Sequence, residues 1–179
     1  MIQEYTITAF SENHIGLLNR ITIIFTRRSV NIESLTVSES SIPGLHKFTI
    51  VVYATKEKVE QVVKQIDKLV EVIKAYYHPE EEIIYQEIAL YKVPTEALLE
   101  SNTLEKTIRK HSARILEVTH DYTVIEKTGH KEETEQLFQE LNQYGVKQFT
   151  RSGRVAITKL KQELLTSYLN QVDSLTSNN

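Results

Sequence analysis

The sequence predicts an α+β fold with two tandem units, each built in the order strand, helix, strand, strand, helix, strand. Three observations support this fold class. Apolar residues alternate along short segments, as in half-buried strands, and they recur at helical spacing in the segments between. The same order of patterns then occurs a second time, and 179 residues are enough for two small domains that each bury a core.

The first unit begins with an alternating strand over 2–10, in which Tyr5, Ile7 and Ala9 share one face. A helix follows, and its apolar positions are Leu17, Ile21, Ile24 and Phe25. The other elements expected in this unit are a strand over 31–38, a turn at 42–44, a strand marked by Phe48, Ile50 and Val52, a helix over 56–69 and a strand over 70–77.

The second unit repeats this order with different residues. Its expected elements are a strand over 83–93, a short helix over 103–111, a hairpin of 113–119 with 122–128, a helix over 131–144 and a closing strand over 146–158 that breaks near Gly153. Gly145 stands where a helix C-cap is needed. Both units are therefore expected to be ferredoxin-like, with an antiparallel sheet covered on one face by two helices.

Two segments mark the expected domain boundaries. A linker is expected over 79–83, where Pro79 precedes three consecutive glutamates, so that the domains span 1–78 and 84–160. Residues 161–179 remain as a terminal helix with a polar tail. The apolar stripe of this helix consists of Leu164, Leu165, Tyr168, Leu169, Val172 and Leu175. We expect the helix to pack on its own domain, and docking to a partner is the alternative.

Charge and composition exclude several classes of protein. The formal net charge of −3, with both signs interspersed, provides no basic surface for nucleic acid or membrane. The chain has no cysteine, so it can form no disulfide or thiolate metal site. No segment approaches the ~20 apolar residues that cross a bilayer, and the N-terminus does not resemble a signal peptide. We expect a cytoplasmic protein.

Catalytic groups are nearly absent from the sequence. The six histidines lack metal-ligand spacing, and we expect each in a turn or on the surface: His14, His46, His78, His111, His120 and His130. The five glycines form no phosphate-binding loop, and there is no Gly-x-Ser-x-Gly nucleophile motif. We therefore expect no catalytic residue, no metal site and no cofactor on this chain.

The segment between the first strand and the first helix suggests a small-molecule site. Asn13 can cap the helix, and Gly16 permits a sharp turn and close approach of a ligand. The unpaired N–H groups of a helix N-terminus would hold a carboxylate, and Asn31 offers an amide where the next strand begins. The alternative is an ordinary cap and an ordinary turn. The candidate effector-binding residues are Asn13, His14, Ile15, Gly16, Leu17 and Asn31.

A sheet with helices on one face leaves its other face and its edges open. Such surfaces favour pairing with a second copy, so we expect a homodimer. Two facing loops, one from each copy, would then enclose a ligand between the chains. An effector bound there regulates only through its differential affinity for two arrangements of the subunits.

Several motifs together give the chain a family resemblance. Glu12-Asn13-x-x-Gly16, Arg20 and the run 31–35 (Asn-Ile-Glu-Ser-Leu) resemble the signature of the acetolactate synthase small regulatory subunits. Segments 68–73, 87–93 and 151–153 follow in the order that this family shows, and the resemblance covers residues 2 to about 160. It implies that 1–78 is an ACT domain, a module that senses amino acids, and that 84–160 is the small subunit's C-terminal ferredoxin-like domain.

The resemblance also implies a function and partners. It implies a non-catalytic subunit that binds and activates the large catalytic subunit, which converts two pyruvates to acetolactate and CO2. Feedback inhibition by a branched-chain amino acid, valine first, would regulate valine, leucine and isoleucine synthesis. Thiamine diphosphate, magnesium and FAD would belong to the partner. The effector would sit at the interface of an ACT homodimer, touching the residues that match Asn13 and Gly16, with Asn31 from the facing chain.

Two features depart from the family pattern. Ile15 stands where the family often has proline, and the chain continues beyond Lys161 for longer than usual. A different class of protein is the alternative, namely a stand-alone ACT-type sensor that regulates another enzyme or a transcription factor. A sensor of this kind that binds DNA needs a reading element, and the sequence shows neither a basic helix nor a helix-turn-helix.

Overall fold

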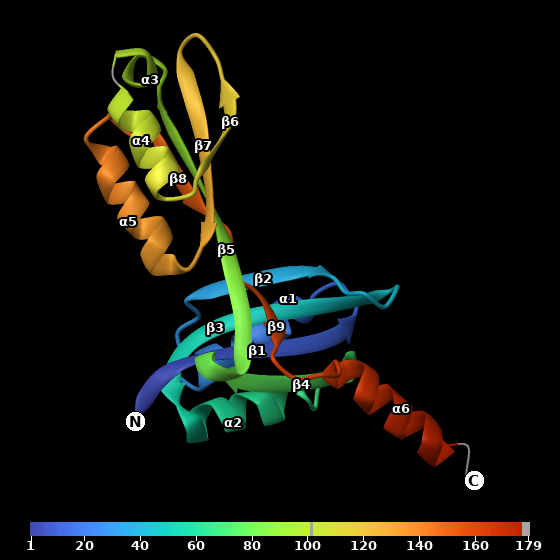
Figure 1. Cartoon of the computed structure of the whole chain (residues 1–179). Coiled ribbons are helices and arrows are strands. Elements are labelled where there is room, and N and C mark those ends of the chain that lie inside the picture. The colour runs from blue at the N-terminus through green and yellow to red at the C-terminus, as the bar shows by residue number, and fades with distance from the viewer. Residues whose placement is uncertain (101, 177–179) are drawn as a thin grey trace. The chain divides into compact units, whose positions relative to one another are not determined.

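Strands β1–β4 and helices α1 and α2 form the first unit in the predicted order (Figure 1). The structure is a computed structural model that describes residues 1–100 and 102–176. The elements are β1 (Ile2–Glu12), α1 (Leu17–Arg27), β2 (Ser34–Glu39), β3 (Leu45–Thr55), α2 (Lys56–Ile66) and β4 (Val72–Pro79). All neighbouring strands are antiparallel, and the sheet order is β2-β3-β1-β4.

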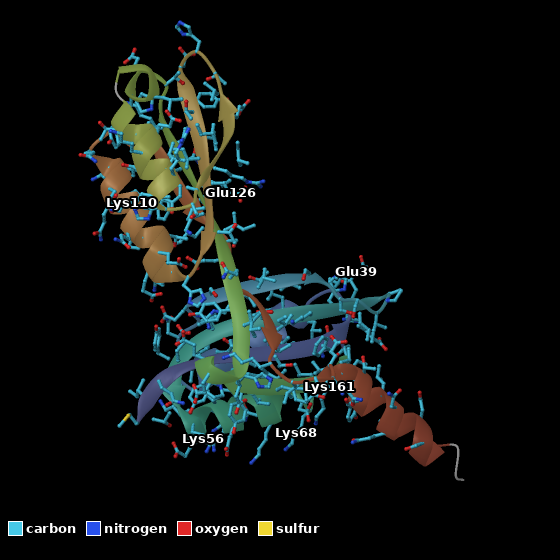
Figure 2. All side chains as sticks on the ribbon, viewed as in Figure 1. Glu39, Lys56, Lys68, Lys110, Glu126 and Lys161 are labelled. Carbon is cyan, nitrogen blue, oxygen red and sulfur yellow. The ribbon has the colours of Figure 1, made fainter. Side chains whose placement is uncertain are left out.

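The core of the first unit lies between one face of this sheet and the two helices. The predicted face of β1 is correct, because Tyr5, Ile7 and Ala9 are all buried in this core. The predicted apolar positions of α1 and α2 are buried with them: Leu17, Ile21, Ile24, Phe25, Val59, Val62, Val63 and Ile66. Charged residues lie on the other side of α2, and Figure 2 shows Lys56 at its start and Lys68 just past its end, both exposed.

The second unit has the same topology. After a 3-10 turn, η1 (Glu80–Glu82), its elements are β5 (Ile83–Pro94), α3 (Glu96–Glu100), α4 (Asn102–Lys110), β6 (Arg114–Val118), β7 (Tyr122–Gly129), α5 (Lys131–Asn142) and β8 (Gln148–Arg151). The sheet order β6-β7-β5-β8 corresponds strand by strand to that of the first unit. The predicted fold class, two ferredoxin-like units and a C-terminal helix, is therefore confirmed.

The core of the second unit is built on Tyr91 of β5. Its ring stacks on Phe149 with centroids 5.1 Å apart, and its hydroxyl donates to the carbonyl of Thr134 at 2.6 Å. Burial raises the pKa of this phenol above its ordinary value. Helix α5 presents Leu137 and Leu141 to this core as predicted, and Gly145 follows with φ +75°. That conformation is left-handed, but α5 ends at Asn142 with Gln143 as its C-cap, so the predicted C-cap at Gly145 is wrong by two positions.

The compact units divide the chain differently from the expected domains. The first unit joins Met1–Ile84 to the chain from Arg154 onward, and the second is Tyr85–Gly153. Residues 154–160, expected with the second domain, thus belong to the first unit. The reason is Arg154, which is 7% exposed, pairs with Glu4 at 2.6 Å and donates to Thr6 Oγ1 at 2.8 Å. A buried guanidinium must be paired, and its carboxylate lies on β1.

The C-terminal segment covers the outer face of the first sheet, away from α1 and α2. Strand β9 (Val155–Thr158) and helix α6 (Leu164–Thr176) follow Arg154. Ala156 and Leu165 are buried, and Tyr76 of β4 donates its hydroxyl to the carbonyl of Leu164 at 3.2 Å. The terminal helix therefore packs on the first unit, and this part of the sheet face is covered by the chain itself rather than left open.

Some local expectations differ from the structure. The expected linker is short, since β4 includes Pro79 and only the 3-10 turn separates it from β5. His78 lies within β4 and is 7% exposed, so its predicted surface or turn position is wrong. Ser177, Asn178 and Asn179 of the expected polar tail lie outside the described residues, as does the side chain of Leu175. In the part of the chain described, no helix is long and apolar enough to span a membrane.

Candidate functional site

The candidate site is the loop that joins β1 to α1. Helix α1 begins at Leu17, and its N-cap is Gly16, in the left-handed conformation with φ +84°. The prediction that Asn13 caps this helix is wrong, because α1 has no side-chain cap. The backbone closes the turn itself: Leu17 N–H donates to His14 O and Arg20 N–H donates to Gly16 O, each at 3.2 Å.

The loop offers unpaired donors to solvent, as predicted. The N–H groups of Leu18 and Asn19 have no acceptor among the described residues. They lie in the first turn of α1, where the helix carries its partial positive charge. Asn13 is exposed beside them and Ile15 is 98% exposed. The arrangement can accept an anionic group and place an apolar one against Ile15.

Glu71 anchors this loop, and sequence reasoning assigned it no role. Its carbonyl accepts the N–H of Glu12 at 3.0 Å, and its carboxylate pairs with Arg20 through Oε1. His14 Nδ1 lies 3.9 Å from the same oxygen. The hydrogen bond from Arg20 holds the pKa of Glu71 below its ordinary value. Spacing could not reveal this contact because 50 residues separate the pair.

The other carboxylate oxygen of Glu71 is also of interest. Glu71 Oε2 is buried and has no hydrogen-bond partner among the described residues. An unpaired buried acceptor is costly, and an ammonium group would satisfy it. Glu71 therefore places an acidic group against the loop that carries the unpaired N–H donors, and a zwitterionic amino acid requires groups of these two kinds.

Leu17 has a different position from the one expected for a contact residue. Its side chain is 2% exposed and belongs to the core, and its N–H is already used by His14 O. Leu17 fixes where the helix begins. Leu18, which is 45% exposed, is the leucine that faces outward.

Asn31 lies at the opposite end of the sheet from the loop. Strands β1 and β2 run in the same direction because both are antiparallel to β3. Asn31 precedes β2, whereas the loop follows the eleven residues of β1, a length of roughly 35 Å. Asn31 is exposed and donates Nδ2–H to Glu33 Oε1 at 2.8 Å. One chain therefore groups residues 13–17 but does not bring Asn31 to them.

The described residues contain no group of three or more metal-ligating side chains. With its two ferredoxin-like units and its glycine-based loop before α1, the chain has the architecture of the ACT-domain proteins. Residues 7–74 match the AHAS small subunit-like ACT domain, and residues 86–160 match the small subunit of acetolactate synthase.

Individual relatives agree with these matches. The acetolactate synthase small subunit of Bacillus subtilis is 35% identical over 162 residues, 90% of this chain and 94% of that protein. The Mycobacterium leprae small subunit is 34% identical over 155 residues, covering 87% and 91% of the two chains. The crystal structure of the Thermotoga maritima small subunit superimposes with a TM-score of 0.81 at 31% identity, over 90% of this chain and 100% of that one. This chain belongs to the family of acetolactate synthase small subunits.

Proposed function

We propose that this chain is the regulatory subunit of an acetolactate synthase, which activates the catalytic subunit and confers feedback inhibition by a branched-chain amino acid, valine first. The observation that supports this proposal most directly is the family match over both units. The donors of the loop and the free oxygen of Glu71 suit the carboxylate and ammonium groups of such an effector.

A second copy of the chain would complete the site. Strand β2 is the edge of its sheet and pairs only with β3 among the described residues. Antiparallel pairing of two β2 edges reverses the direction of the second copy. Asn31 of one chain would then lie toward the end of the sheet where the other chain has its 13–17 loop. The separation of the two within one chain is what this homodimer requires.

The chemistry would belong to the catalytic partner. In this proposal the large subunit holds thiamine diphosphate, magnesium and FAD and condenses two pyruvates to acetolactate and CO2. The small subunit contributes no reacting group. Its effector changes activity only if its affinity differs between the active and inhibited arrangements of the complex.

The test is acetolactate formation by the cognate large subunit, with and without this chain, across a valine titration. We expect stimulation by the chain and inhibition by valine. Asn13→Ala and Asn31→Ala should each abolish the inhibition while the stimulation persists. Asn142→Ala, an exposed asparagine at the end of α5, is the matched control and should respond like the unmodified chain.

Each other outcome has a distinct meaning. Stimulation without any valine effect would support the catalytic subunit as the partner and would require the same titration with leucine and isoleucine. These differ from valine by only ~1–3 kcal/mol of apolar contact. Failure of the chain to bind or stimulate the large subunit contradicts the proposal and favours a sensor that regulates another protein.

A further inference from the structure

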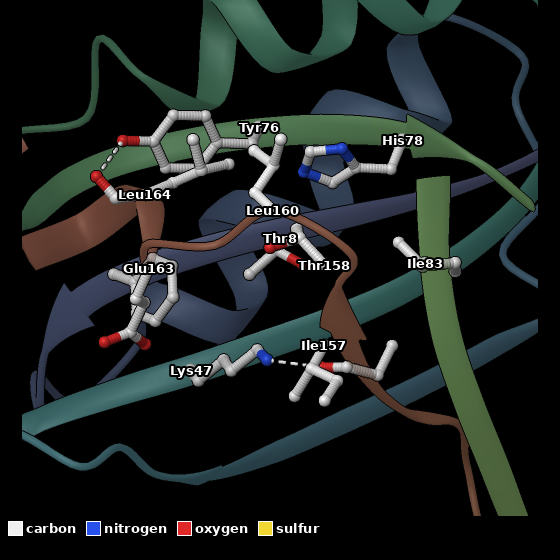
Figure 3. A pocket seen from close by; sticks show the side chains of 12 residues that line it. Thr8, Lys47, Tyr76, His78, Ile83, Ile157, Thr158, Leu160, Glu163 and Leu164 are labelled. Atoms are coloured by element: carbon white, nitrogen blue, oxygen red, sulfur yellow. Dashed lines mark hydrogen bonds between the residues drawn. The ribbon is translucent and has the colours of Figure 1, made fainter. Parts of the chain in front are cut away.

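A cavity of about 210 Å³ lies on the outer face of the first sheet, between the strands and the C-terminal segment (Figure 3). Strands β1, β3 and β4 form its floor, and residues 156–164 form its other wall. Most of its lining is apolar, with Phe10, Ile83 and Leu160 among the contributing side chains. It lies on the face of the sheet opposite the helices, whereas the effector loop follows the end of β1.

Lys47 supplies a cation to this cavity. Its ammonium donates to the carbonyl of Ala156 at 2.6 Å, which leaves two of its three protons for other acceptors. No carboxylate of the described residues lies within 4 Å of it. Burial lowers the pKa of Lys47. The charge of Glu163, which lines the same cavity more than 4 Å from the ammonium, partly opposes this change. A carboxylate inside the cavity would provide the close counter-charge that Lys47 lacks.

His78 supplies a second polar group, from the other side of β1. Its side chain is 9% exposed, and its Nδ1 lies 3.0 Å from Glu82 Oε2. With Nδ1–H donated to that carboxylate, Nε2 is an acceptor. This Nε2 is buried, has no partner among the described residues and belongs to a side chain that lines the cavity. Figure 3 shows the imidazole of His78 and the amine of Lys47 well apart, with Leu160 and Thr8 between them.

The strand register explains this separation. Lys47 lies opposite Phe10 on β1, and His78 lies opposite Thr6, four residues further along the same strand. At about 3.3 Å per residue, these two positions on β1 are roughly 13 Å apart. The long Lys47 side chain shortens that distance inside the cavity. A ligand that reaches both groups therefore has two polar ends and an apolar middle.

We infer that this cavity binds a short hydroxy carboxylic acid. Its carboxylate accepts hydrogen bonds from Lys47, its apolar body packs against Phe10 and Leu160, and its hydroxyl donates to Nε2 of His78. This site is separate from the effector loop of the proposed function. Binding here does not depend on Asn13 or Asn31, so Asn13→Ala and Asn31→Ala should leave it unchanged.

The experiment is calorimetric titration of the full chain with three probes: 6-hydroxyhexanoate, hexanoate and hexylamine. We expect 6-hydroxyhexanoate to bind most tightly, hexanoate more weakly and hexylamine not at all. Lys47→Met should weaken 6-hydroxyhexanoate binding about tenfold or more, because a charge-assisted hydrogen bond is lost. His78→Phe should remove the difference between the two acids.

Lys161→Met is the matched control for the loss of one positive charge. Lys161 is exposed near the start of α6 and does not line the cavity (Figure 2). The affinity of the Lys161→Met variant for 6-hydroxyhexanoate should stay within about twofold of that of the unmodified chain, since exposed charges interact weakly. Equal weakening by Lys47→Met and Lys161→Met, or binding of hexylamine as tight as that of the acids, would overturn the inference. So would the absence of acid binding.

Lys47→Met also removes the hydrogen bond to the carbonyl of Ala156, so a loss of binding could reflect a change in structure. A second variant tests the cavity without removing this bond. Leu160→Trp places a large ring at the cavity wall, where Leu160 is 57% exposed. The chain has no tryptophan, so the emission wavelength of this residue reports its burial directly. We expect blue-shifted emission, an unchanged melting temperature and loss of acid binding. Blue-shifted emission with undiminished binding would show that the acid sits elsewhere.

Discussion

At the residue scale, Gly16 determines the conformation of the proposed effector loop, residues 13–17. Its φ of +84° is a left-handed conformation, and an added Cβ would meet nothing within 4 Å. The cost of Gly16→Ala is therefore backbone strain, about 1–2 kcal/mol of unfolding free energy. Urea unfolding of the two proteins measures this loss. We also expect the substitution to weaken inhibition by valine, because it moves the N–H groups that follow it.

Gly145 provides the control for this prediction. It has nearly the same φ, +75°, equally open surroundings, and a place in the turn after α5 in the second unit. Gly145→Ala should lose about as much stability and leave the valine response intact. An equal change of the valine response in both variants would mean that lost stability, rather than the loop itself, affects regulation.

The ion pair of Glu71 with Arg20 predicts a pH dependence. Its hydrogen bond from Arg20 lowers the pKa of Glu71 from 4.5, so the folded state binds this proton less tightly than the unfolded state. The resulting stabilisation is fully present above the ordinary pKa and is lost as the pH falls through the folded-state pKa. Urea midpoints of Glu71→Gln should therefore lie below those of the unmodified chain at pH 7, and the difference should shrink in acid.

Arg20→Gln supplies the partner substitution for a double-mutant cycle. If the pair carries the effect, adding Glu71→Gln to Arg20→Gln should cost less than adding it to the unmodified chain. That coupling should also decline with added salt, since Arg20 is 41% exposed. A coupling that stays constant from pH 7 into acid would contradict the assignment of this ion pair.

For single residues, the sequence predicts a conformation that depends on the local backbone alone. It does not predict one that depends on a partner far away in the chain. The sharp turn at Gly16 follows from glycine's access to positive φ, and it is present. The prediction of Asn13 as the helix cap uses residue type alone and is wrong, because Gly16 occupies the N-cap position of α1. His78 is buried because β4 extends past it and Glu82 accepts its bond, neither of which periodicity reveals.

At the scale of elements, we predict that the chain self-associates through the edge strand β2. Val37 is 41% exposed on this edge, and charged residues on edge strands oppose pairing with another chain. Val37→Lys should therefore shift the chain from the expected dimer toward monomer, because each of the two paired edges would carry an added positive charge. Sedimentation equilibrium at several concentrations measures the change, and the valine response should fall with it.

The corresponding edge of the second unit provides the control. Ile115 of β6 is 39% exposed, and its strand holds the position in its sheet that β2 holds in the first. Ile115→Lys should leave the dimer unchanged. Dissociation by Ile115→Lys but not by Val37→Lys would place the self-association on the second unit and remove the support for a site shared across β2.

Elements with strong periodicity were predictable, whereas their assignment to units was not. The alternation of β1 and the apolar stripe of α2 each identify a core face without further information. Residues 154–165 carry equally clear patterns, yet they group with the first unit: β9 pairs with β5, and the residues after Arg154 lie against β1, β3 and β4. That choice depends on Arg154 meeting Glu4, a contact between residues at the two ends of the sequence.

At the scale of the whole molecule, the two halves of the proposed effector site lie at opposite ends of one sheet. If each site takes Asn13 from one copy and Asn31 from the other, two defective chains can complement each other. In a mixed dimer of Asn13→Ala with Asn31→Ala, one of the two sites has both asparagines. After random exchange of equal amounts, about a quarter of all sites are intact, because an isologous dimer has two equivalent sites. Valine inhibition, absent from either variant alone, should return in part.

The double variant distinguishes this complementation from simple dilution. A chain with both Asn13→Ala and Asn31→Ala, mixed with the unmodified chain, forms mixed dimers in which each site lacks one asparagine. Exchange should therefore reduce the valine response below that of the same amount of unmodified chain alone, while stimulation of the catalytic subunit continues. If one chain instead supplied both residues, the unmodified copy would keep its own site in every mixed dimer. The response would then stay constant on mixing, and the two single variants would not restore each other.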